Sequence, residues 1–171
     1  GRPEPEVQTL MSLLQEFLVG ELPLLLRHRI RLLVIGETSS LPFAVRQVLE
    51  RTVTATAGNT EMTLVLGISY AGRNEIVRAA RRLAAEAADG KIAPGEITEE
   101  LFSSRLDTAG VPDPDLVIRT SGELRISNFL LWQSAYAEFA FTEVLWPDFG
   151  KAEFLQALEE YSRRQRRFGL T

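Results

Sequence analysis

Short apolar runs alternate with longer helical patterns along this chain, and this alternation constrains the fold more than any other feature. Brief apolar runs bounded by turn residues predict strands, at 31–36, 63–69, 115–119 and 139–142. Apolar residues at helical spacing predict helices, at 6–19, 41–57, 74–88, 98–101, 128–134 and 151–166. The sequence therefore predicts an α/β fold, with a mostly parallel central sheet covered by helices on both faces.

The size and composition of the chain are those of one globular domain. Its 171 residues suffice for a sizeable core, and it is 45% apolar and 25% charged. No internal repeat or linker interrupts it, so we predict a single domain over residues 1–171. The pattern opens on a helix and contains about four strands, fewer than a doubly wound domain usually has. We therefore expect an N-terminal portion of the fold to be missing from this sequence.

Charge and residue usage exclude several classes of function. The net charge of -4 argues against a general nucleic-acid binder, which would carry a basic face. The absence of cysteine excludes disulfides and thiolate chemistry. The single histidine, His28, stands between two arginines and is expected to be a solvated residue at a helix end. A histidine-rich metal site is thereby excluded, and histidine-dependent acid–base catalysis is disfavoured.

The hydropathy of the chain favours a cytoplasmic protein. No apolar stretch is expected to reach the roughly 18–20 residues that span a bilayer. The first six residues lack the apolar core of a signal peptide. Peripheral contact with a membrane surface remains compatible with this composition.

The segment 115–133 contains the strongest signal for chemistry. An apolar run ends at Arg119, and Arg125 follows after a turn of small polar residues. Ligands of parallel α/β sheets lie at the carboxyl ends of strands, and guanidinium groups bind phosphate oxygens bidentately. Ser127 or Asn128 is expected to cap a new helix, whose free N–H groups would add to an anion site.

A second interpretation of the two arginines is structural. Arg119 and Arg125 would then pair with Glu123 and nearby carboxylates on the surface, at about 0–1 kcal/mol per pair. The pattern alone gives both interpretations equal weight.

A longer stretch around these arginines resembles a known family. Residues 119–133, with the sequence RTSGELRISNFLLWQ, are similar to the signature of the cis-prenyltransferases, whose bacterial member is undecaprenyl diphosphate synthase. The resemblance covers essentially the whole chain and continues at residues 70–76, 136–138, 141–142, 145–149 and 166–169.

The resemblance implies a Mg²⁺-dependent transferase that condenses isopentenyl diphosphate onto an allylic diphosphate, such as farnesyl diphosphate, with cis stereochemistry. The implied product is a long-chain polyprenyl diphosphate of the undecaprenyl type, for the cell-wall lipid carrier. The family also implies a homodimer that has no nucleic-acid partner. The dimer would be cytoplasmic and would contact the inner face of the membrane peripherally for product release. The alternative is a non-catalytic or truncated accessory subunit that binds diphosphate and dimerises.

The resemblance also implies substrate-binding residues. Isopentenyl diphosphate would be held by Arg119, Arg125 and Ser127, which are the implied catalytic residues. The resemblance also implies that residues near both ends of the chain approach diphosphate. Arg2 would do so near the N-terminus, and Arg167 and Gly169 would reach the site of the partner subunit across a dimer.

Metal and tunnel residues follow from the same resemblance. Glu138 matches an acidic residue near the metal, and Mg²⁺ usually takes one or two carboxylates plus phosphate oxygens. A hydrophobic tunnel that sets product length is implied to include Met62, Leu64 and Leu66. Apolar residues of this kind would be core in any parallel strand, so only the resemblance distinguishes a tunnel from a core.

The sequence departs from the family pattern in four places, one of them the absence of the family's Ser/Thr-Glu-Asn-Trp segment. The N-terminal Asp-Gly-Asn-Gly-Arg-Trp loop, with the family's main metal-binding aspartate, is absent. Ala71 and Val65 stand where the family commonly has Gly and Asn, which is expected to change only local packing. We therefore expect residues 1–171 to be the C-terminal two-thirds of a catalytic domain, incomplete by themselves.

Overall fold

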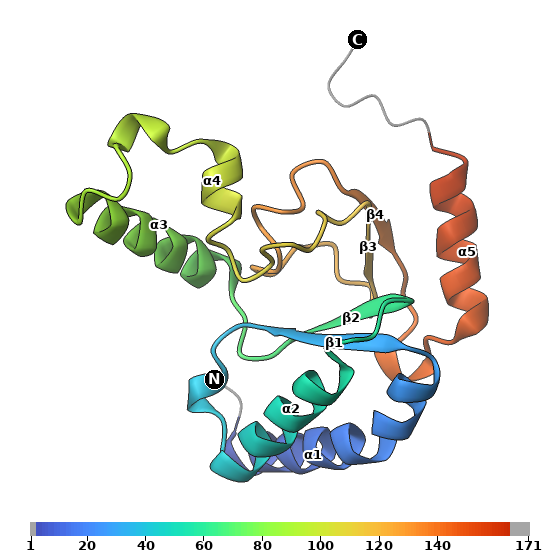
Figure 1. Cartoon of the computed structure of the whole chain (residues 1–171). Helices are drawn as coiled ribbons and strands as arrows, with labels where there is room; N and C mark the ends of the chain where they lie inside the picture. The colour runs from blue at the N-terminus through green and yellow to red at the C-terminus, as the bar shows by residue number, and fades with distance from the viewer. Residues whose placement is uncertain (1–2, 165–171) are drawn as a thin grey trace. The chain divides into compact units, whose positions relative to one another are not determined.

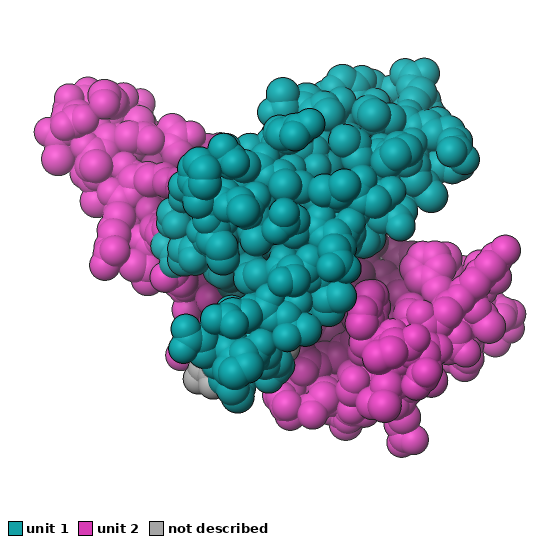
Figure 2. Space-filling model, turned by 90° about the horizontal axis from the view of Figure 1, so that it is seen from below, with its two compact units in different colours: residues 1–70 teal, residues 71–171 magenta. Residues whose placement is uncertain are grey.

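The computed structural model describes residues 3–164, and the chain divides into two compact units, residues 1–70 and 71–171 (Figure 2). Each unit contains one pair of parallel strands with helices beside it (Figure 1). The predicted α/β class with parallel strands is confirmed. The prediction of one domain over the whole chain stays a prediction, and each unit is described by itself.

The first unit packs two helices against its strand pair. Its elements are α1 (Glu4–Arg27), β1 (Ile30–Ile35), a 3₁₀ turn (Thr38–Ser40), α2 (Phe43–Thr56) and β2 (Met62–Gly67). Strands β1 and β2 pair in parallel from Ile30↔Met62 to Ile35↔Gly67. Helices α1 and α2 lie side by side below this pair in Figure 1. The core between these elements consists of Leu18, Leu32, Leu41 and Leu49.

Helix α1 is longer than the sequence predicted. A helix over 6–19 that Gly20 interrupts was expected, but α1 continues through Gly20 and Pro23 to Arg27. A proline inside a helix removes one backbone hydrogen bond. Leu18 and Leu25, on either side of the interruption, are both buried, and this packing outweighs the local propensity. His28 is the exposed C-cap residue of α1, as predicted.

Helix α1 also corrects the expectation about apolar length. By length and composition, α1 is able to cross a membrane. Only 11% of its most apolar 18-residue stretch is buried inside the protein. A protein-covered helix and a signal sequence pass the same test, so this property does not assign α1 to a membrane. Its exposed apolar side chains include Val7, Leu10, Leu13, Phe17 and Val19.

A buried hydroxyl joins α2 to β1. The Thr56 hydroxyl oxygen accepts a hydrogen bond from the Leu32 backbone N–H at 3.0 Å and donates to the Thr52 carbonyl at 2.9 Å. Both threonines are almost fully buried. A buried N–H without a partner costs about 1–3 kcal/mol, so Thr56 satisfies a donor that water does not reach.

We expect Thr56→Val to lower the free energy of unfolding by about 1–3 kcal/mol, because an isosteric side chain leaves the Leu32 N–H unsatisfied. Denaturant unfolding measures this change. Thr54→Val, an exposed position on the same helix, is the control and is expected to stay within about 0.5 kcal/mol of the wild type. Equal effects of the two substitutions would contradict the role of Thr56.

The second unit contains the other strand pair. Its helices and strands are α3 (Gly72–Ala88), α4 (Glu99–Ser103), β3 (Leu116–Arg119), β4 (Glu138–Phe141) and α5 (Lys151–Ser162), with 3₁₀ turns at Pro94–Glu96 and Trp146–Asp148. Strands β3 and β4 pair in parallel from Leu116↔Glu138 to Arg119↔Phe141. Helix α5 contacts β4, and α4 contacts α3. Thr98 caps α4, because its hydroxyl oxygen accepts a hydrogen bond from the Leu101 N–H at 3.1 Å.

The helix predicted over 128–134 is wrong, because turns occupy these residues. Ser127, Asn128 and Leu130 have φ angles of 50°, 63° and 46°. Left-handed residues cannot continue a right-handed helix, so neither Ser127 nor Asn128 caps one. No helix N-terminus of this segment therefore contributes to anion binding.

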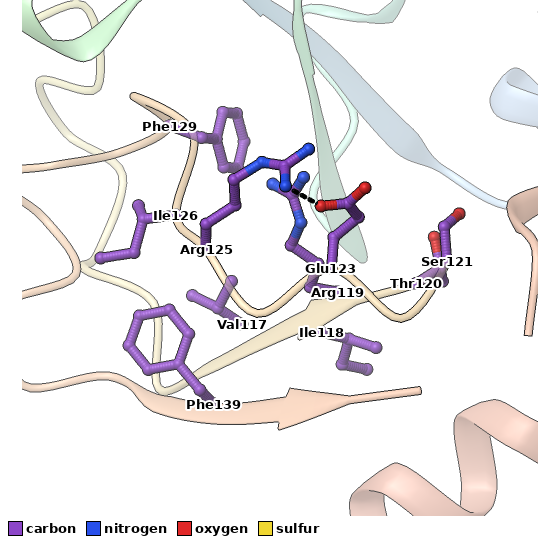
Figure 3. A pocket seen from close by; sticks show the side chains of 10 residues that line it. All are labelled: Val117, Ile118, Arg119, Thr120, Ser121, Glu123, Arg125, Ile126, Phe129 and Phe139. Carbon is purple, nitrogen blue, oxygen red and sulfur yellow. Dashed lines mark ion pairs between the residues drawn. The ribbon is translucent and has the colours of Figure 1, made fainter. Parts of the chain in front are cut away.

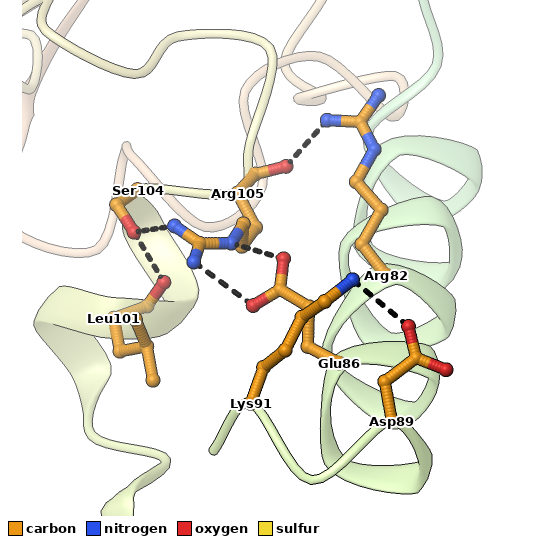
Figure 4. Close-up of polar contacts among 7 residues, drawn as sticks. All are labelled: Arg82, Glu86, Asp89, Lys91, Leu101, Ser104 and Arg105. Carbon is orange, nitrogen blue, oxygen red and sulfur yellow. Dashed lines mark hydrogen bonds and ion pairs between the residues drawn. The ribbon is translucent and has the colours of Figure 1, made fainter.

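A bidentate ion pair joins α3 to the residues after α4 (Figure 4). The Arg105 guanidinium donates to the two Glu86 carboxylate oxygens at 2.8 and 2.9 Å. These hydrogen bonds lower the pKa of Glu86 from its ordinary value and raise the pKa of Arg105. Arg82 adds a bond from its guanidinium to the Arg105 carbonyl at 3.0 Å.

The lowered pKa of Glu86 predicts a pH-dependent stability. The pair stabilises the fold above the unfolded-state pKa of about 4.5, and this contribution is lost as the pH falls through the lower folded-state pKa. We therefore expect Glu86→Gln to be less stable than the wild type at neutral pH and equally stable in acid. Denaturant unfolding at several pH values measures this convergence. The control, Glu100→Gln on exposed α4, should show no such pH dependence.

Candidate functional site

A pocket of about 470 Å³ opens at the carboxyl end of β3. Arg119 is the last residue of that strand, and Arg125 lies in the loop that follows it. Both guanidinium groups extend to the same side of the pocket (Figure 3). The pocket is lined by Val117, Ile118, Arg119, Thr120, Ser121, Glu123, Arg125, Ile126, Phe129 and Phe139. The two arginines that the sequence analysis selected thus line one pocket, and their binding role stays a prediction.

The backbone after β3 explains why the arginines lie together. The Ser121 and Gly122 N–H groups donate to the Val144 and Thr142 carbonyls, both at 2.9 Å, and so extend the pairing with the β4 side. Ser121 and Gly122 have φ angles of 69° and 66°, a left-handed turn that glycine adopts without strain. This turn reverses the chain, so that Arg125 returns to the side of Arg119.

The two arginines differ in their present partners. Arg125 forms an ion pair with Glu123, and its side chain is 65% exposed. The structural interpretation of local pairing therefore holds for Arg125. Arg119 is half-buried, and no ion pair of its guanidinium is found within residues 3–164. An exposed pair contributes about 0–1 kcal/mol, so little free energy holds Arg125 to Glu123.

The pocket lining also contains apolar side chains. Val117 and Phe139 lie on the paired strands, and Phe129 comes from the loop after Arg125. Sequence analysis missed these lining residues. Val117 was detectable, because residues two apart on a strand share a face and Val117 precedes Arg119 by two. Phe129 had no such signal, because a helix was expected there.

Ser127 and Glu138 are not brought to the lining of this pocket. Ser127 is exposed, with a left-handed backbone. Glu138 pairs with Leu116 at the amino end of the strands, whereas Arg119 pairs with Phe141 at the carboxyl end, about 10 Å away at 3.3 Å per residue. The Glu138 carboxylate binds the Arg164 guanidinium at 2.9 Å. Their family-derived roles stay predictions.

The acidic residues of the described chain do not form a magnesium site by themselves. No group of three potential metal ligands occurs within residues 3–164. Glu123 is the one carboxylate of the pocket lining, and it pairs with Arg125. Mg²⁺ needs more oxygen ligands than one carboxylate supplies, so no reaction step is assigned to the metal here.

The other implied residues lie elsewhere. Met62, Leu64 and Leu66 alternate along β2 in the first unit, where Leu64 and Leu66 pack against the Leu18–Leu32–Leu41–Leu49 core. Met62 is 52% exposed. A tunnel role for these side chains stays a prediction. Three implied residues lie outside the described part of the chain: Arg2, Arg167 and Gly169.

Comparison with known proteins identifies a family for the chain. Residues 1–169 match the family model described as "Putative undecaprenyl diphosphate synthase". Isoprenyl transferase of Agrobacterium fabrum is 50% identical over 168 residues, which are 98% of this chain and 68% of that protein. Isoprenyl transferase of Porphyromonas gingivalis is 52% identical over 171 residues, 100% of this chain and 67% of that protein. The chain thus spans about two-thirds of the length of these relatives.

Two solved structures share the fold. Lavandulyl diphosphate synthase from Lavandula x intermedia, in complex with dimethylallyl diphosphate, has a TM-score of 0.96 and 38% identity over 99% of this chain and 73% of that chain. A probable undecaprenyl diphosphate synthase from Campylobacter jejuni has a TM-score of 0.86 and 36% identity, over 98% and 76% of the two chains. These likenesses confirm the predicted fold.

The Glu123–Arg125 pair predicts how the pocket binds an anion. We expect Glu123→Gln to bind inorganic diphosphate about two- to five-fold more tightly, because the carboxylate competes with the anion for Arg125. Titration calorimetry in metal-free buffer measures the Kd. Glu143→Gln removes the same charge from a nearby exposed residue outside the pocket lining, and is expected to leave the Kd unchanged. Weaker binding by Glu123→Gln would contradict this competition.

Proposed function

The chain belongs to the undecaprenyl diphosphate synthase family of prenyltransferases, and from this premise we propose how its pocket serves prenyl transfer. Arg119 and Arg125 hold the diphosphate of isopentenyl diphosphate, and the enzyme condenses such units onto an allylic diphosphate with cis stereochemistry. The single observation that carries this proposal is the convergence of the two guanidinium groups at the end of β3 (Figure 3).

The pocket matches isopentenyl diphosphate in both of its parts. The two guanidinium groups face the charged diphosphate, and each charge-assisted hydrogen bond contributes about 1.5–3 kcal/mol. Thr120 and Ser121 also contribute hydroxyl groups to the pocket lining. Val117, Phe129 and Phe139 form an apolar wall that suits the five-carbon chain. This division orients the substrate with its diphosphate toward the arginines.

The reaction itself places few demands on protein acids and bases. A carbon–carbon bond forms at the allylic carbon, the bond from that carbon to the diphosphate oxygen breaks, and one proton leaves the new unit. His28, the one histidine of the chain, is exposed at the end of α1. We propose that the departing diphosphate accepts this proton. Proton loss at an unchanged rate from an analogue with a different leaving group would contradict this step.

We propose Mg²⁺ as the cofactor and Glu138 as one of its ligands. The support is the family match, since the described residues do not form a complete site. Mg²⁺ often binds through substrate phosphates with one or two carboxylates. Glu138 is half-buried and held by Arg164, so a metal would have to replace that exposed pair.

We further propose the product and the assembly. The proposed product is a long-chain polyprenyl diphosphate of the undecaprenyl type, made from farnesyl diphosphate for the cell-wall lipid carrier. The description of the family supports this product. The two structural relatives carry different product names, so the shared fold leaves product length open. We propose that the protein is a cytoplasmic homodimer without a nucleic-acid partner. It would contact the inner face of the membrane for product release.

The test of the proposed function is substitution of the two arginines. We expect Arg119→Ala and Arg125→Ala each to lower kcat/KM for isopentenyl diphosphate by about 10- to 150-fold, the equivalent of one charge-assisted bond. Incorporation of labelled isopentenyl diphosphate, with farnesyl diphosphate and Mg²⁺, measures this loss. Arg46→Ala, on α2 and ion-paired with Glu50, is the control and should keep wild-type kinetics.

Two outcomes of this test would change the assignment. Unchanged kinetics in both arginine variants would refute the diphosphate role of the pocket. A chain that binds isopentenyl diphosphate through Arg119 and Arg125 but yields no product would favour the alternative, an accessory subunit that binds diphosphate.

A further inference from the structure

We propose that Asn128 is a positioning residue for the diphosphate pocket. By clamping the loop after Arg125 to the first turn of α3, it holds the pocket lining in its binding geometry. This inference rests on the proposed function, and it assigns a specific task to a residue outside the pocket lining.

The clamp consists of two hydrogen bonds from one helix start to one residue. The Gly72 N–H donates to the Asn128 backbone carbonyl at 2.7 Å, and the Arg73 N–H donates to the Asn128 side-chain oxygen at 2.8 Å. The first N–H groups of a helix have no partner within the helix. Ala71, the N-cap residue of α3, has no side-chain acceptor. Asn128 therefore caps α3 from a position 55 residues away in sequence.

The backbone of the loop shows why such a clamp is needed. Ser127, Asn128 and Leu130 are all left-handed, a conformation that L residues other than asparagine, aspartate and glycine rarely adopt. Uncommon conformations persist where surrounding contacts hold them. Asn128 tolerates a positive φ and also supplies the hydrogen-bond acceptor that α3 requires. Because Ser127 and Leu130 are close to Asn128 in the chain, its hydrogen bonds to α3 also hold these two residues in place.

Close packing at Gly72 supports the same clamp. A Cβ atom at Gly72 would lie 2.9 Å from Leu131 Cγ and 3.2 Å from the Asn128 carbonyl oxygen. Gly72 is buried, so the loop lies directly against the start of α3. No side chain fits between them.

The far end of the loop is anchored to α3 as well. The buried Gln133 side-chain amide donates to Glu75 at 3.1 Å and to the Thr108 hydroxyl at 2.9 Å. Residues 128–133 are thus attached to α3 and its neighbours at both ends. Phe129 and Arg125, which line the pocket, lie one and three residues from Asn128. A shift of Asn128 is therefore expected to displace both of these lining residues.

Displacement of the groups that bind a substrate slows its reaction strongly, because a shift of about 1 Å can lower the rate on the order of a hundred-fold. Asn128→Gly keeps the positive φ accessible and removes only the side-chain acceptor. We expect it to raise the KM for isopentenyl diphosphate about ten-fold, with kcat changed less than two-fold. Asn128→Asp keeps an acceptor oxygen at the same place and should restore KM to within two-fold of the wild type.

A matched control separates positioning from general stability. Asn59 also ties backbone together, since its side-chain amide donates to the Leu25 and Ile30 carbonyls at 3.3 and 2.8 Å. It belongs to the first unit. Asn59→Gly is expected to lower the melting temperature while leaving KM unchanged. A melting temperature for each variant, and KM and kcat at a fixed concentration of folded enzyme, complete the comparison.

Binding of inorganic diphosphate in metal-free buffer makes the test independent of turnover. An increased diphosphate Kd for Asn128→Gly that Asn128→Asp restores would support the positioning role. This holds even if the wild type forms no product. The absence of product would overturn only the proposed prenyl transfer. Unchanged KM and Kd in Asn128→Gly, with an active wild type, would overturn the positioning role and leave the proposed function standing. Failure of Asn128→Asp to restore either value would also overturn it.

Discussion

The parallel pairing of β3 with β4 is the constraint on which the site depends. Its hydrogen bonds continue past the strand ends through the Ser121 and Gly122 N–H groups, which fixes the turn after Arg119. That turn is left-handed and returns the chain over the pocket, so Arg125 approaches Arg119. These backbone bonds thus place Arg119 and Arg125 at the lining of one pocket, where Arg125 pairs with Glu123.

Buried and exposed polar contacts have different tasks in this molecule. Thr56 and Gln133 make buried hydrogen bonds that hold helices and loops in one arrangement. Arg125 and Glu138 make exposed or half-exposed ion pairs, which contribute little and exchange readily. The Glu123–Arg125 and Glu138–Arg164 pairs therefore hold their side chains only weakly.

Much of the fold was predictable because its signals are local. Apolar runs and helical periodicity located all four strands and α2, α3 and α5 to within a few residues. Two predictions failed for physical reasons. Helix α1 continues past Gly20 because the burial of Leu18 and Leu25 outweighs propensity. Residues 128–134 form turns because Asn128 binds α3 in place of capping a helix of its own.

The sequence by itself determined the α/β class, the family and the placement of Arg119 at a strand end, since each depends on neighbouring residues or on a contiguous motif. Tertiary structure alone decided that Ser127 and Glu138 lie away from the pocket lining, and that Phe129 and Phe139 belong to it. It also decided that Asn128 caps α3. The physical reason is that these outcomes depend on partners many residues away, as between Asn128 and Arg73, and periodicity carries no information about such partners.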